Sequence, residues 1–136
     1  MSDEKLKSLF DEPSKVKNEL HIGLCKGRHD IKTNNGKAVK EFIFDEEVPF
    51  DFGWLLNEAI HRLFSIREEN STEKANARLD IYLYITGFTP ALTSVLKAYS
   101  KYVYRDDNNG YRYANLLLMH YDRESERYVK QMWGRN

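Results

Sequence analysis

The feature that most constrains the fold is a strand, a helix and a second strand in close succession. The first strand is expected over residues 79–86, where Leu and Ile occupy alternate positions. An amphipathic helix follows over 90–103, and a second apolar strand is expected over 114–121. Two strands joined in this way run parallel in one sheet, and the connection is almost always right-handed. The sequence therefore predicts an α/β fold.

The segment before this unit has the same pattern. Apolar residues recur at helical spacing over 51–67, and Asp51 is a suitable N-cap for that helix. The helix can connect a strand at 38–44 to the strand at 79–86, which gives a second strand–helix–strand unit. Strand 79–86 carries apolar residues on one face and tyrosines on the other, so we expect it to be central and covered on both sides.

The ends of the chain complete the expected fold. A short strand is predicted over 20–25, and Asn34–Gly36 then offers the positive φ that a hairpin-type turn requires. The segments 20–25 and 38–44 are therefore expected to be neighbouring strands joined by a longish loop. A last strand over 127–133 should pair back on its neighbour as a hairpin. The charged residues 1–18 predict a peripheral helix or a tail. The prediction is one α/β domain over 1–136, with a small mixed sheet, βαβ units and a C-terminal β-hairpin.

Composition limits the classes of function. Twenty-one basic and twenty-one acidic side chains cancel, so no strong nucleic-acid binding and no membrane partner are expected. Cys25 is the one cysteine and is expected to be a core residue, and no secretory signal or membrane-spanning run is visible. These features indicate a cytoplasmic protein. The four histidines and Cys25 lack metal-ligand spacing, so neither a metal nor another cofactor is predicted.

A candidate ligand site lies where the parallel strands end. Ligands of open α/β sheets bind outside the carboxyl ends of the strands, and the loop after strand 79–86 brings Thr86, Gly87 and Thr89 to that edge. A glycine lets a ligand approach the backbone, and the N-terminus of the next helix attracts phosphate or carboxylate groups. The alternative is an ordinary strand-to-helix turn with Thr89 as the helix cap.

A second polar cluster joins this site if strand 20–25 runs parallel to its neighbours. Lys26 and Arg28 can bind phosphate oxygens. His29, oriented by Asp30, is a candidate general acid or base, and His120 is a second candidate. The alternatives are a solvated turn for the cluster and a half-buried structural histidine at position 120.

Residues 83–93 read Leu-Tyr-Ile-Thr-Gly-Phe-Thr-Pro-Ala-Leu-Thr. This run resembles the strand, threonine-containing loop and helix of CARF-like domains, which bind cyclic oligonucleotides. It is also similar to segments of small uncharacterised phage and prophage proteins. The resemblance implies binding of a nucleotide-type ligand at Thr86, Gly87 and Thr89.

Nine tyrosines are more than a core of this size needs. Between Tyr102 and Tyr113 they alternate with Arg105 and Arg112, a composition suited to stacking and to protein interfaces. Asp106 and Asp107 lie in the same segment and oppose a nucleic-acid groove, so an oligomer or partner surface is expected there.

Three functions therefore stay open. The first is a homodimeric binding protein that holds a phosphate-bearing or nucleotide-type ligand between Thr86–Thr89 and Lys26–His29, for example as a phage counter-defence factor. The second is a protein-interaction module or an inhibitor of a host protein. The third, and the least favoured, is a metal-independent phosphodiesterase or ring nuclease that uses His29 or His120 as acid and base and Arg28 for the developing charge.

Overall fold

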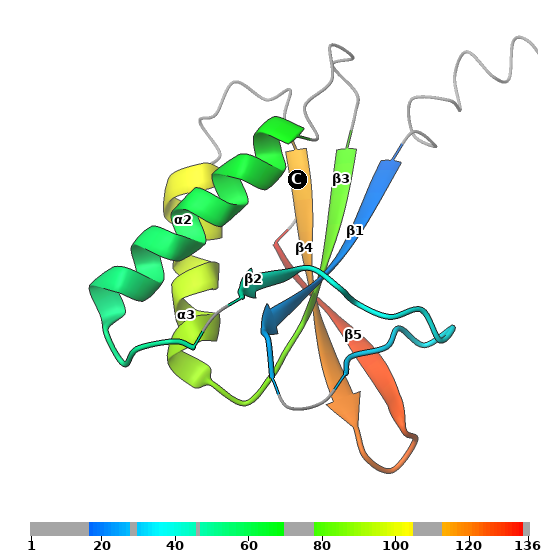
Figure 1. The fold of residues 1–136 in the computed structure, drawn as a ribbon. Helices are drawn as coiled ribbons and strands as arrows, with labels where there is room; N and C mark the ends of the chain where they lie inside the picture. The colour runs from blue at the N-terminus through cyan, green and yellow to red at the C-terminus, as the bar shows by residue number, and fades with distance from the viewer. Residues whose placement is uncertain (1–16, 28–29, 46, 70–77, 105–112, 135–136) are drawn as a thin grey trace, which may run out of the picture.

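The computed structural model describes residues 17–27, 30–45, 47–69, 78–104 and 113–134 (Figure 1). Its elements, in chain order, are β1 (Lys17–Cys25), β2 (Phe42–Phe44), α2 (Phe52–Glu69), β3 (Arg78–Tyr84), α3 (Thr89–Lys97), the π-helix η1 (Ala98–Val103), β4 (Tyr113–Asp122) and β5 (Arg127–Gly134). Most of the expected charged N-terminal segment, residues 1–16, lies outside the described residues. No helix in the described part of the chain is long and apolar enough to cross a membrane.

The strands form one five-stranded sheet in the order β2-β1-β3-β4-β5. The first four strands are parallel, and β5 pairs antiparallel with β4. Strand β3 is central, as its apolar face and its tyrosine-bearing face predict. The predicted α/β fold with a mixed sheet and a C-terminal hairpin is confirmed (Figure 1).

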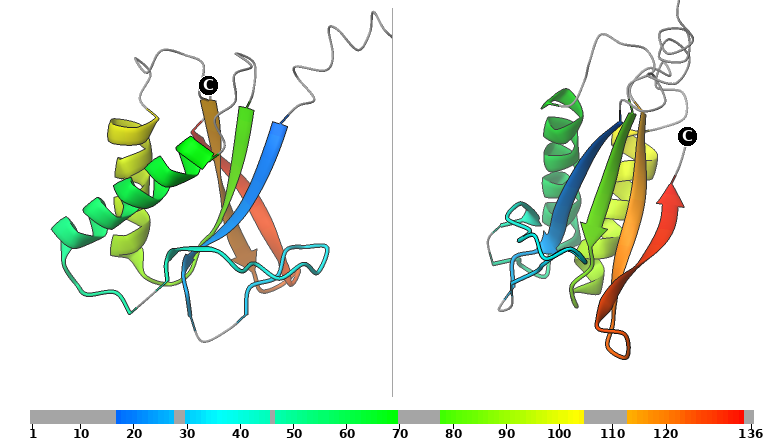
Figure 2. Two further views of the ribbon diagram at one scale, coloured as in Figure 1. Left: turned by 45° about the horizontal axis from the view of Figure 1, so that its top comes forward. Right: turned by 90° about the vertical axis from the view of Figure 1, so that its right-hand side faces the viewer.

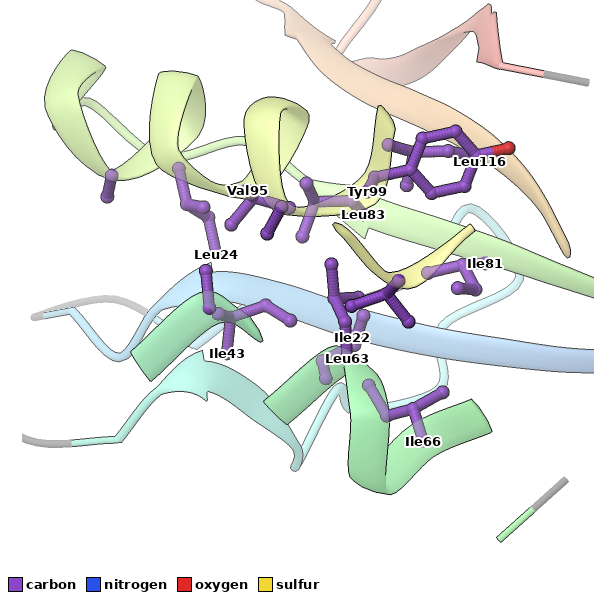
Figure 3. Close-up of a cluster of buried hydrophobic side chains, with 14 of the residues drawn as sticks. Ile22, Leu24, Ile43, Leu63, Ile66, Ile81, Leu83, Val95, Tyr99 and Leu116 are labelled. Carbon is purple, nitrogen blue, oxygen red and sulfur yellow. The ribbon is translucent and has the colours of Figure 1, made fainter. Parts of the chain in front are cut away.

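Both helices cover one face of this sheet (Figure 2). Helix α2 presents buried residues three or four positions apart, the spacing that places side chains on one helical face. They meet the alternate strand residues that point to the same side (Figure 3). Labelled members of this core are Ile22, Leu24, Ile43, Leu63, Ile66, Ile81, Leu83, Val95, Tyr99 and Leu116.

The other face of the sheet is covered near the carboxyl ends of its strands by the chain between β1 and β2. A second buried cluster forms there from Ile31, Val39, Phe42, Tyr84 and Met119. The segment that follows β1 thus crosses this second face of the sheet before it returns to the edge as β2 (Figure 1). We call it the open face, because α2 and α3 both pack on the opposite face.

This path corrects one expectation. The strands 20–25 and 38–44 are neighbours as predicted, but they run parallel and are not joined by a hairpin. The turn at Asn34–Gly36, with Gly36 at φ 86°, closes only a small loop between Lys32 and Ala38. The intervening chain has to cover Tyr84 and Met119, so it enters β2 in the same direction as β1.

The start and end of α3 also differ from the prediction. The first helical amides, of Ala91 and Leu92, donate to the carbonyl of Phe88, which makes extended Phe88 the N-cap. Thr89 is already inside the helix and caps nothing with its hydroxyl, so its expected capping role is wrong. At the other end the helix widens into η1, where the Tyr104 amide donates to the Tyr99 carbonyl at 3.0 Å.

Candidate functional site

A cleft of about 810 Å³ opens at the carboxyl edge of the sheet. Its walls are the loop after β1, the loop after β3 and the hairpin that joins β4 to β5. Parallel pairing of β1 with β3 brings these loops to the same edge, as the binding rule for α/β sheets requires. The lining residues are Gly27, Asp30, Ile31, Lys32, Thr33, Asn34, Thr86, Gly87, Tyr121, Glu126, Arg127 and Tyr128.

Asn34 fixes the width of the cleft. Its side-chain amide donates to the carbonyl of Tyr128 at 3.0 Å, and its side-chain oxygen accepts from the Tyr128 amide at 2.9 Å. One side chain therefore satisfies both backbone groups of a β5 residue that lies 94 positions away. The loop is stiffened further because Thr33 accepts from the backbone of Lys37 and donates to Asn35.

The cleft carries balanced charge and an aromatic wall. Lys32 and Arg127 supply two positive charges, and Asp30 and Glu126 supply two negative charges. The exposed Tyr121 ring lies 5.3 Å from that of Tyr128, in an edge-on contact. The Tyr128 ring also packs at 4.8 Å against a buried ring, that of Tyr84. Burial and then the nearby Tyr121 raise the pKa of Tyr128, so the Tyr128 phenol is neutral at physiological pH.

The floor of the cleft includes Thr86, which follows β3. Its hydroxyl is buried and has no hydrogen-bond partner among the described residues. Burial raises the pKa of the Cys25 thiol above its usual range and outweighs the lowering effect of the nearby Thr86 side chain. Cys25 is a buried, protonated thiol, which confirms the expectation of a core residue.

The structure brings together part of the predicted ligand site. Thr86 and Gly87 line the cleft. Lys26 and Thr89 are exposed and are not among its lining residues. Arg28 lies outside the described residues.

Neither of the two histidines considered as catalytic groups is among the described residues that line the cleft. His29 lies outside the described residues. His120 is exposed rather than half-buried and shares a 2.7 Å hydrogen bond with Gln131 on the adjacent strand. It points to the opposite side of β4 from the cleft-lining Tyr121, because neighbouring strand residues alternate between faces.

A cluster of polar and aromatic side chains around His21, which the sequence did not indicate, lies on the open face of the sheet. The ring of His21 stacks on Tyr82 with centroids 4.5 Å apart, and its Nδ1 lies 2.8 Å from the Tyr84 hydroxyl. Its Nε2 lies 3.5 Å from a carboxylate oxygen of Glu19. Burial, with smaller effects from Tyr128, Tyr82 and Glu19, raises the pKa of Tyr84 to about 12. Only the register of β1 with β3 brings these residues together.

The tyrosine-rich segment was predicted to be a partner surface. Tyr102 is exposed, but Tyr104 is buried and its ring packs 5.4 Å from that of Tyr99. Burial raises the pKa of Tyr104. Residues 105–112 lie outside the described part of the chain.

No three His, Cys, Asp or Glu side chains within the described segments form a group that could hold a metal ion. No family model, no curated protein and no solved structure matches this chain. The assignment of a function therefore depends on the physical character of the cleft.

Proposed function

We propose that this protein binds a nucleotide-type small molecule carrying a single phosphate group in the cleft at the carboxyl edge of its sheet. The observation that carries the proposal is the combination, in one cleft, of an aromatic wall and two cations, with Tyr121 on one side and Lys32 and Arg127 available for an anion. The volume of about 810 Å³ lies within the range of about 300–1,000 Å³ that is typical of small-molecule sites.

The lining residues suggest how such a ligand would bind. A base would stack on the exposed Tyr121 ring, a contact that any nucleobase can make. Arg127 would hold the phosphate through two N–H groups, with Lys32 as a second positive charge. Gly87 leaves space for the ligand to approach, because nothing lies within 4 Å of where its Cβ would be.

The two carboxylates of the cleft limit the ligand class. Asp30 and Glu126 can accept hydrogen bonds from ribose hydroxyls or from the amino group of a base. They also repel additional phosphates, so a mononucleotide or a cyclic nucleotide suits the balanced charge better than a triphosphate. The resemblance of residues 83–93 to a cyclic-oligonucleotide-binding loop favours a nucleotide-type ligand but does not bear on the number of phosphates.

A thermal-shift screen against mono-, di-, tri- and cyclic nucleotides tests the proposal. A ligand present at about 100 times its Kd stabilises the protein by about 2.7 kcal/mol, which raises Tm by several degrees. We expect a mononucleotide or cyclic nucleotide to give the largest shift. Chromatography of the recovered ligand then shows whether it has been cut, which separates binding from the phosphodiesterase alternative.

Variants on one strand provide the control. Arg127→Ala is expected to weaken binding roughly tenfold or more, because it removes a charged hydrogen-bond donor. Lys130→Ala removes an exposed cation from the same strand outside the cleft and should leave binding unchanged. No Tm shift with any nucleotide, or equal binding by Arg127→Ala and the wild type, would contradict the proposal.

A further inference from the structure

Three aromatic side chains stand exposed around the start of α2. Phe50 is 72% exposed, Phe52 63% and Trp54 37%. Burying one such side chain fully contributes about 1.5–3 kcal/mol of favourable free energy, and the exposed parts of these three side chains do not make that contribution. Large exposed apolar patches mark interaction sites on soluble proteins, and the rings of Phe50 and Phe52 are direct neighbours.

Other aromatic side chains of the protein pack against these rings and hold them in place. The ring of Phe50 lies 5.3 Å from that of Phe52 and 6.0 Å from that of Phe88, which packs against the main core. The ring of Trp54 lies 6.1 Å from the buried Phe44. An aromatic group that is already ordered loses little conformational entropy on binding, which is typical of the residues that dominate interfaces.

The chain segment that carries the rings is strongly acidic. Residues 41–61 contain six acidic side chains and neither Lys nor Arg, in a chain whose total charge is zero. Glu41 is compensated by Arg62, with 3.7 Å between nitrogen and oxygen. The exposed Asp45, Glu47 and Asp51 make no ion pair with any Lys or Arg of the described segments. Phe50, Phe52 and Trp54 with these three carboxylates are called the acidic–aromatic surface.

We infer that the acidic–aromatic surface binds a basic polypeptide segment in which Lys or Arg residues flank an apolar side chain. The apolar side chain would bury Phe50 and Phe52. Guanidinium or ammonium groups would pair with the carboxylates and lie over the aromatic rings, where cations are attracted to the π-electrons.

The charge also excludes other occupants. A second copy bound through this same surface would bring two acidic surfaces together, and anionic lipid or nucleic acid would be repelled in the same way. This inference does not depend on the nucleotide proposal, because neither Phe50 nor Phe52 lines the cleft.

Fluorescence anisotropy with a labelled synthetic peptide tests the inference in the absence of any nucleotide. The probe is a 16-residue amphipathic helix of Leu, Lys and Arg, and its counterpart has Glu in place of every basic residue. We expect the basic peptide to bind and the acidic peptide not to bind. Raising the salt concentration from about 50 to 300 mM should weaken binding severalfold.

The variants separate the aromatic and acidic contributions. Phe50→Ala/Phe52→Ala should weaken binding at least about tenfold, whereas Phe64→Ala removes a ring of α2 that is 51% exposed and lies outside this surface, and it should not weaken binding. Asp45→Lys/Glu47→Lys should abolish binding, and the exposed control pair Glu69→Lys/Glu124→Lys should not. Because the substituted side chains are exposed, each variant should keep the wild-type Tm. Absence of binding by the basic peptide, or equal binding by Phe50→Ala/Phe52→Ala and the wild type, would overturn the inference.

Discussion

On the open face of the sheet, Tyr84 lies between the cluster around His21 and the cleft. Its hydroxyl contacts Nδ1 of His21, and its ring packs against Tyr128, which lines the cleft. The alternation of residues 79–86 predicts that this side chain lies opposite the apolar face. Its contact with His21 depends on the pairing of β1 with β3, which no local pattern specifies.

The raised pKa of Tyr84 predicts a loss of stability in alkali. Its pKa is about 12 in the folded protein, against about 10 for an ordinary tyrosine. The unfolded state therefore releases its proton first, so the stabilisation is complete below about pH 10 and is lost between about pH 10 and 12. Tyr104 and Tyr128 are shifted in the same direction and add to the effect.

Urea unfolding at pH 8 and at pH 11 measures this dependence. The free energy of unfolding should fall at pH 11, and Tyr84→Phe, which cannot ionise, should fall less. An equal fall in the wild type and in Tyr84→Phe would show that Tyr84 is not responsible.

The pairing of β1 with β2 shows that hydrophobic periodicity predicts where strands and helices lie but not the direction in which two strands pair. Hydrophobic spacing was enough to predict α2, β3, β4 and the hairpin of β4 with β5. The direction of β2 depends on Phe42 packing beneath residues that lie far along the chain, Tyr84 and Met119. Because tertiary contacts make that choice, the expected turn at Asn34–Gly36 forms but closes only the small antiparallel loop between Lys32 and Ala38, and it does not join strands 20–25 and 38–44 as a hairpin.

Gly23 tests this packing. A Cβ at Gly23 would clash with the ring of the buried Phe42, so Gly23→Ala overfills the contact of β1 with β2. The expected loss is about 1–3 kcal/mol in the free energy of unfolding, measured by urea denaturation.

Gly87→Ala is the matched control for this experiment. Nothing lies within 4 Å of its added Cβ, so a change of less than about 0.5 kcal/mol is expected. Equal stability of Gly23→Ala and the wild type would mean that β2 does not pack as described.

The cleft is a property of the whole molecule, which explains why the sequence predicted only part of it. Thr86 and Gly87 follow from one rule about strand ends, and the structure places both in the lining. Lys32 and Arg127 were missed because Asn34, paired with the backbone of Tyr128, draws a distant loop and hairpin together. Neither segment carries a motif that marks this contact.

The most direct test of the nucleotide proposal is a ¹H–¹⁵N NMR titration with the nucleotide that stabilises the protein most in the thermal screen. The amides expected to shift are those of Gly27, Thr33, Gly87 and Tyr128, which surround the cleft. Saturable shifts confined to these positions and their neighbours would support a ligand site at the carboxyl edge of the sheet. A spectrum that does not change, or shifts confined to the start of α2, would contradict it.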